Sequence, residues 1–299
     1  MSNQYDDTNL PQIGDENNVA VEHFKPVNNL DVIIKSEIDI QISSAKAYPR
    51  SLKNFKTKAL SMATLDMQTA EMCFYTLPRG GKTIEGPSVR LAEIINSAWQ
   101  NIRSAARIIG NDRKTITAQA ICHDLENNVS ITIEVKRRIT DKNGKTYTED
   151  MQVVTGNAAC SIALRNAIFK VIPMAYTKEI YEQVKRVAAG DVSTLADRRI
   201  KALKHFKDMG VGYDRIYSVL GVQSDVDIDQ DGLLKLIGLA NALRDGDTTL
   251  EEAFPKLPDA KSETQIKGEN AVKDTVNKIK DAKTNGNGGS GNDRKEYRK

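Results

Sequence analysis

Basic side chains occur at even spacing in two stretches of the sequence. Arg103 and Arg107 lie four residues apart, and Lys136 and Arg138 lie two residues apart. Residues at even spacing on a β-strand share one face, so each pair would direct two cations to the same side of a sheet. Such a row can follow a phosphate backbone without reading its bases. We therefore expect these four residues to contact nucleic acid, with a solvated or salt-bridged surface as the alternative for each.

Four further cations extend this set. Arg79 and Lys82 enclose two glycines in the run LPRGGKTIEGP, a loop whose backbone N–H groups can also meet phosphates. Arg90 and Arg165 fall on predicted helices. Arg165 and Lys170 are five residues apart, which is about 140° around a helix, so they need not act together.

Aromatic residues that could stack on bases are few, at 5% of the chain. The candidates are Tyr75, Trp99 and Tyr147. Trp99 stands at the end of an apolar helical stripe, and this position favours a place in the hydrophobic core instead.

Motifs for catalysis or cofactor binding are incomplete. The string GGKT resembles a phosphate-binding loop, but Thr76 stands where that motif needs a glycine, five residues before Gly81. The three histidines and three cysteines show no zinc-type spacing. Asp124 and Glu126 form a carboxylate pair at a predicted strand end, which leaves a metal-dependent nuclease as an alternative. We expect no cofactor, no metal site and no enzymatic activity.

Charge is distributed unevenly along the chain of 299 residues, whose formal net charge is +3. Residues 51–190 hold 20 basic and 13 acidic side chains, an excess compatible with a polyanionic partner or a solvated surface. The N-terminal stretch lacks the pattern of a signal peptide, and no run approaches the roughly 20 apolar residues of a membrane-spanning helix. With scattered cysteines that we expect to be buried free thiols, these features favour a reducing cytoplasm.

The sequence predicts an antiparallel sheet followed by a helix. Alternating apolar and polar residues favour strands at 102–109, 115–123 and 129–140. Asn143-Gly144 is typical of a type I′ turn and would lead to a fourth strand near Lys145. An apolar stripe then predicts a helix over 157–172 that packs on the sheet.

Other segments flank this sheet. Residues 30–42 alternate and favour a strand, although the same run can begin a helix. Long helices are predicted over 52–77 and from Pro87, and residues 195–254 predict three or four short helices. The expected domains are a disordered tail at 1–28, a core at 29–190, a small helical domain at 191–257 and a disordered polar tail at 258–299.

Four stretches between about residues 36 and 255 resemble a phage-encoded family. They are EIDIQISSAKAYPRS, FYTLPRGGKTIEGPSVRLAEI, VKRRITDKNGK and TGNAACSIALRNAIFKVIP. The predicted order of helix, antiparallel sheet and long helix also resembles the core of phage single-strand annealing proteins of the Rad52/RecT superfamily. The run ALRNAIFKVIP is similar to the helix that follows their sheet.

This resemblance implies an α+β fold of the Rad52/RecT type, with a three- to four-stranded antiparallel sheet flanked by long helices and a small all-α C-terminal domain. It implies ATP-independent binding and annealing of single-stranded DNA in phage recombination, by a homo-oligomeric ring or filament in the bacterial cytoplasm, away from membranes. A single-strand-binding protein or an exonuclease would be the protein partner. The alternatives are the nuclease and a phage interaction protein without a nucleic-acid role.

Overall fold

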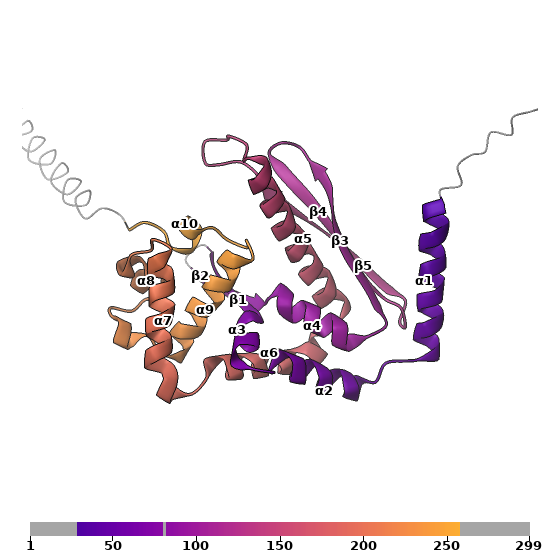
Figure 1. The fold of residues 1–299 in the computed structure, drawn as a ribbon, viewed down its shortest axis with the longest axis horizontal. Coiled ribbons are helices and arrows are strands. Elements are labelled where there is room, and N and C mark those ends of the chain that lie inside the picture. Colours follow the sequence, from indigo (N-terminus) through magenta and orange to yellow (C-terminus); the bar gives the residue numbers. More distant parts are fainter. Residues whose placement is uncertain (1–28, 80–81, 258–299) are drawn as a thin grey trace, which may run out of the picture. The chain divides into compact units, whose positions relative to one another are not determined.

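The computed structural model describes residues 29–79 and 82–257 and shows an α+β protein (Figure 1). The tails predicted at 1–28 and 258–299 lie outside the described residues. The described chain forms two compact units, the first from 29–69 and 87–184 and the second from 70–86 and 185–257. This division differs from the predicted boundary at residue 190, because the segment 70–86 groups with the C-terminal helices.

A three-stranded antiparallel sheet is the framework of the first unit. Its strands β3 (Ile102–Asn111), β4 (Thr115–Asp124) and β5 (Val129–Arg138) lie in the order β3-β4-β5. The central strand buries its even-numbered side chains on one face, since successive residues of a strand point to opposite sides. Those buried residues are Ile116, Ala118, Ala120 and Cys122. The three predicted strands are confirmed.

The long helix α5 (Glu149–Val171) lies along the buried face of this sheet (Figure 1). The helix comes so close that a Cβ added at Gly156 would lie 3.1 Å from Cδ1 of Ile116. It begins earlier than the predicted residue 157, because the hydroxyl of Thr148 caps its first turn. It ends before Pro173, and α6 (Met174–Ala189) follows.

Helices α2 (Leu52–Ala63) and α4 (Val89–Trp99) pack on each other, and α4 also packs on α5. As predicted, α4 begins just after Pro87, and Ser88 is its N-cap. Trp99 is buried at the end of this helix, which confirms the core position that its apolar stripe indicated.

The predicted helix over 52–77 is wrong in its second half. After α2, Asp66 accepts a hydrogen bond from the N–H of Thr69 and starts a separate short helix, α3 (Met67–Met72). The chain then becomes extended as β1 (Phe74–Arg79). Pro78 disfavours helical backbone at the residue before it, so the apolar spacing could not continue as a helix.

Residues for which the alternation favoured a strand form helix α1 (Asn29–Ala47) instead. The alternating pattern predicts a strand when one face is buried, whereas this helix leaves most of its branched side chains in solvent. Val32 is 56% exposed and Ile40 is 63% exposed, while Ala45 near the C-terminal end is fully buried. The strand prediction is therefore wrong, and the helical alternative is correct.

The main sheet has three strands and no fourth one within the described residues. A single antiparallel bridge joins Thr140 to Thr146 where the fourth strand was predicted. Gly144 has a φ of +82°, but Asn143 is not in the left-handed region, so the turn is not of type I′. Asp141 shapes it by accepting a hydrogen bond from the N–H of Asn143.

The second unit contains β1 and β2 (Lys82–Pro87), which form a two-stranded sheet, and a group of α-helices from the C-terminal part of the chain. The helices are α7 (Leu195–Asp208), α8 (Tyr213–Leu220), α9 (Gln230–Arg244) and α10 (Leu250–Ala253). Their core contains Phe206, Ile216, Leu236 and Phe254. The predicted short helices are present, but the unit also contains strands.

Helix α9 approaches β1 closely at Gly238. A Cβ added there would lie 2.8 Å from the Cβ of Thr76 and 2.9 Å from its backbone nitrogen, and Thr76 is itself buried. Since a backbone atom cannot move aside cheaply, only glycine fits at this position.

We predict that Gly238→Ala lowers the melting temperature of the protein. Overpacking costs about 1–3 kcal/mol, and a clash with backbone places this change at the upper end. That cost exceeds the roughly 1 kcal/mol that alanine adds through helix propensity. Gly110→Ala is the control, because a Cβ there would meet nothing nearer than 3.9 Å. An equal melting temperature for both variants would contradict the close approach.

Candidate nucleic-acid interface

The face of the main sheet opposite α5 is exposed to solvent. On β4 this face carries Thr117, Gln119 and Ile121, which alternate with the buried residues. Ile121 is 41% exposed although it lies on the central strand, so no element of the described chain covers the middle of this face. We call this surface the open face.

The strand register places four predicted cations on the open face, with Arg103 near one end of the sheet and Lys136 and Arg138 near the other. Directly paired residues of neighbouring strands point to the same side of a sheet. Arg107 lies opposite Gln119, and Lys136 lies opposite Thr117. The same alternation places the other two predicted strand cations here. The complete set is Arg103, Arg107, Lys136 and Arg138.

These four cations have weak partners within the protein. Nη2 of Arg107 donates to Oε1 of Gln119 at 3.3 Å, and Nη1 of Arg103 lies 3.5 Å from Oε1 of Gln41 on α1. Lys136 and Arg138 are exposed, and none of the four forms an ion pair with another described residue. Their charges are therefore available to an anionic ligand.

The turn between β3 and β4 adds two cations that the sequence analysis missed. Arg113 and Lys114 are exposed there. Asp112 holds the turn, and hydrogen bonds from Thr115 and Lys114 lower the pKa of its carboxyl group, with the charge of Lys136 acting in the same direction. The turn therefore lies near the basic end of the open face. The run NDRK, which lies between two predicted strands, is the sequence feature that could have identified these two cations.

The remaining predicted cations lie elsewhere. Arg165 is buried on α5, which packs against the opposite face of the sheet. Arg90 is exposed on α4 and forms an ion pair with Glu93 at 3.0 Å. Arg79 and Lys82 belong to the second unit, and the side chain of Lys82 lies outside the described residues. The structure therefore places four of the eight predicted residues on one face of the sheet.

The three aromatic candidates for stacking are not on the strands of the open face. Trp99 is buried, with its ring centroid 4.8 Å from that of Phe55 in an edge-to-face arrangement. Tyr75 and Tyr147 are half-buried on β1 and in the segment before α5. By the same register the open face also carries the imidazole of His123, opposite Arg103, and the carboxylate of Glu134, opposite Gln119. It offers mainly charged, hydroxyl and amide groups rather than large aromatic rings.

A buried ion pair closes the end of the sheet beside this face. The guanidinium of Arg50, between α1 and α2, binds both carboxylate oxygens of Asp124, one of them at 2.6 Å. The indole N–H of Trp99 donates to the same carboxylate at 3.1 Å, and the Arg50 guanidinium lies 4.5 Å from the centroid of the Trp99 ring. We call Arg50, Asp124 and Trp99, together with Glu126 and Asn101, the Arg50 node.

Glu126 and Asn101 extend the Arg50 node. Glu126 accepts hydrogen bonds from both the backbone and the side chain of Arg50, and Asn101 donates to Glu126 and to the carbonyl of Tyr48. Partial burial alone would raise the pKa of Glu126, but the hydrogen bonds from Asn101 and Arg50 outweigh it and lower that pKa. The segment that follows α1 is thus attached to the sheet.

The Arg50 node also accounts for the carboxylate pair on which the nuclease alternative rested. Asp124 and Glu126 are engaged by Arg50, and the described residues contain no group of three acidic, histidine or cysteine side chains suited to a metal ion.

Burial raises the pKa of the Cys73 and Cys122 thiols to about 12, with the charge of Asp124 adding to the effect at Cys122.

No family model, curated protein or solved structure matches this chain. Among the described residues, every helix is too short or too polar to cross a membrane.

We predict that Arg50→Ala lowers the free energy of unfolding by about 3–5 kcal/mol, because it leaves the buried Asp124 carboxylate without its cation. Arg90→Ala is the matched control: that arginine is exposed and its ion pair contributes about 1 kcal/mol or less. Denaturant unfolding of both variants measures the difference. Equal losses would show that the Arg50 node is not a stabilising element.

The lowered pKa of Glu126 predicts a pH-dependent contribution to stability. A carboxyl group with a depressed folded-state pKa stabilises the fold in its charged form, and this contribution disappears as the pH falls through that pKa. Glu126→Gln should therefore be less stable than the wild type at neutral pH. The difference should shrink as the pH falls below 4.5, the ordinary value for this group. A difference that stays constant across an acid titration of the unfolding free energy would contradict this assignment.

Proposed function

We propose that this protein binds single-stranded DNA on the open face and anneals complementary strands without ATP. The observation that carries the proposal is the placement of Arg103, Arg107, Lys136 and Arg138 on one uncovered sheet face, contributed by both edge strands. The resemblance to annealing proteins of the Rad52/RecT superfamily supports the same role, in phage recombination and as a homo-oligomeric ring or filament.

The spacing of the cations suits an extended strand. Alternate residues on a β-strand are roughly 6.6–6.8 Å apart, close to the step of an extended nucleotide. Lys136 and Arg138 have this spacing on β5, and Arg107 stands on the other edge strand. Each neutralised phosphate releases condensed counterions, so binding to such a face weakens steeply as salt rises.

The chemistry of the open face favours contacts to the backbone rather than to base edges. Hydroxyl and amide groups of Thr115, Thr117 and Gln119 lie between the cations and can donate to phosphate oxygens. A strand held by its phosphates keeps its Watson–Crick edges free to pair with a second strand. This is the property that annealing requires, and it needs neither a nucleotide cofactor nor a metal ion.

We predict that replacing Lys136 and Arg138 together by alanine weakens single-strand binding and slows annealing. Loss of two phosphate contacts should reduce the log–log salt slope of affinity by about 1.4, at about 0.7 per contact on single strands. The melting temperature should hardly change, because exposed charges contribute little to stability. Fluorescence anisotropy across a salt series and strand annealing without nucleotide measure the two effects.

The matched control replaces Lys53 and Lys58, two exposed lysines of α2, by alanine. This variant has the same net charge as the open-face variant, so a general charge effect would change both alike. If the open-face variant binds as well as the control at every salt concentration, DNA does not bind at this face. If the wild type neither binds nor anneals single strands at low salt, the proposed function is wrong.

A further inference from the structure

A hollow of about 450 Å³ lies beside the open face, between α1, the end of α4 and the start of β3. Its apolar lining comes from Ile40 of α1, Ile102 of β3 and Leu125 at the end of β4. The volume is within the range of pockets that hold small organic ligands. Flat apolar groups such as nucleobases are the ligands whose faces match such walls.

The polar lining of the hollow is suited to a nucleotide. Arg103 belongs both to the open face and to the hollow, so a strand that follows the open face reaches the hollow at this residue. Ser44 and Ser104 also line the hollow. These groups can hold a phosphate while the attached base enters between the apolar walls.

Asn96 of α4 also lines the hollow, and its side chain carries an acceptor without a hydrogen-bond partner among the described residues. Its side-chain Oδ1 is buried and accepts no hydrogen bond from any described residue. Because this oxygen is shielded from solvent in the free protein, a base N–H meets it only where the Asn96 side chain turns toward the hollow, and that contact relieves the cost of an unpaired buried acceptor. All four DNA bases carry at least one N–H on the Watson–Crick edge, so this contact is compatible with any sequence.

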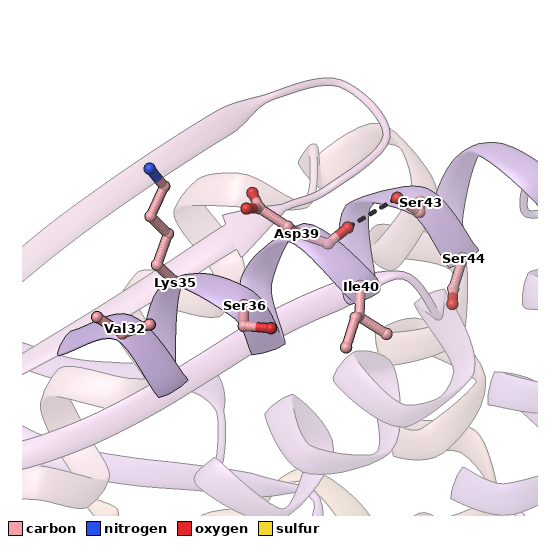
Figure 2. A pocket seen from close by; sticks show the side chains of 7 residues that line it. All are labelled: Val32, Lys35, Ser36, Asp39, Ile40, Ser43 and Ser44. Carbon is pink, nitrogen blue, oxygen red and sulfur yellow. Dashed lines mark hydrogen bonds between the residues drawn. The ribbon is translucent and has the colours of Figure 1, made fainter. Parts of the chain in front are cut away.

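A second hollow of about 500 Å³ continues from the first along α1, and the two share Ile40 and Ser44. Figure 2 shows its side chains along one side of the helix, where the Ser43 hydroxyl donates to the carbonyl of Asp39. Ile40 and Ser44 of α1 thus belong to the lining of both hollows.

We infer that the first hollow receives one nucleobase of a DNA strand bound on the open face, with the adjoining phosphate at Arg103. This inference rests on the proposed function and deepens it. Each protein chain holds one base out of the stack, while the other bases on the open face stay free to pair. The insertion fixes the position of the strand relative to the protein without selecting a sequence.

The test compares an oligothymidine strand with an abasic strand of the same length, which has the same phosphates and no bases. Two substitutions alter the hollow: Asn96→Ala removes the orphan acceptor, and Ile40→Ser removes an apolar wall at an exposed position of α1. Ile33→Ser is the control for the second, because Ile33 is also exposed on α1, at 53%, and lines neither hollow.

The wild type should bind oligothymidine more tightly than the abasic strand. Asn96→Ala and Ile40→Ser should each weaken oligothymidine binding about fivefold, the size of one hydrogen bond or one apolar contact, and leave abasic binding unchanged. Ile33→Ser should resemble the wild type on both strands. Because Ile40 is exposed, its variant remains informative if Asn96→Ala fails to fold.

The outcomes separate this inference from the proposed function. If the wild type binds both strands equally, or if each hollow variant weakens both equally, no base enters the hollow, although strand binding stands. If the wild type binds neither strand, the proposed function fails. Free thymidine monophosphate is the last arm: if it binds in an Asn96-dependent way while strand binding does not depend on Asn96, the hollow takes a free nucleotide and the inference is overturned.

Discussion

The ion pair between Arg50 and Asp124 is the interaction on which the arrangement of the first unit depends. It joins the segment after α1 to the end of the central strand, and Trp99 attaches the end of α4 to the same carboxylate. Breaking such a pair leaves a buried charge without its partner. Loss of the pair should therefore loosen all three segments at once. The hollow beside the open face is bounded by these segments, because the linker that Arg50 anchors connects α1 to the end of the sheet, and α1 meets β3 directly through the weak contact between Gln41 and Arg103.

The central strand and α5 explain why one face of the sheet is available for a ligand. Small side chains let the helix approach closely on one side: Ala118 and Ala120 are fully buried on β4, and Gly156 on α5 faces Ile116. The opposite side has no comparable cover in the described chain, and its central residues alternate between hydroxyl, amide and aliphatic groups. The cations on the two edge strands therefore face solvent from a regular sheet. Their positions are better fixed there than they would be on flexible loops.

Sequence reasoning succeeded where a pattern is tied to burial and failed where it is not. The three strands and α5 were predictable, because alternation and a helical apolar stripe both reflect the buried faces of that interface. The same alternation gave a wrong strand prediction at α1, where Ile33, Ile34 and Ile40 are exposed. The helix predicted beyond residue 63 was too long, because Asp66 and Pro78 act through local backbone geometry. Arg165 shows the remaining difficulty: its charge suggested a ligand, but only the packing of α5 reveals that it is buried. The role of Asp124 was equally hidden, since Arg50 lies 74 residues away in the chain.

Trp99 is the sole tryptophan of the chain, and its position gives the protein an internal optical probe. The indole stands between a guanidinium and a carboxylate, and its ring centroid is 5.5 Å from that of Tyr176 on α6. Indole emission responds to nearby charge and to the entry of water, so the tryptophan emission of the protein reports on one place. Any event that loosens the attachment of α1 to the sheet becomes visible in the emission spectrum without a label, and events confined to the second unit leave that spectrum unchanged.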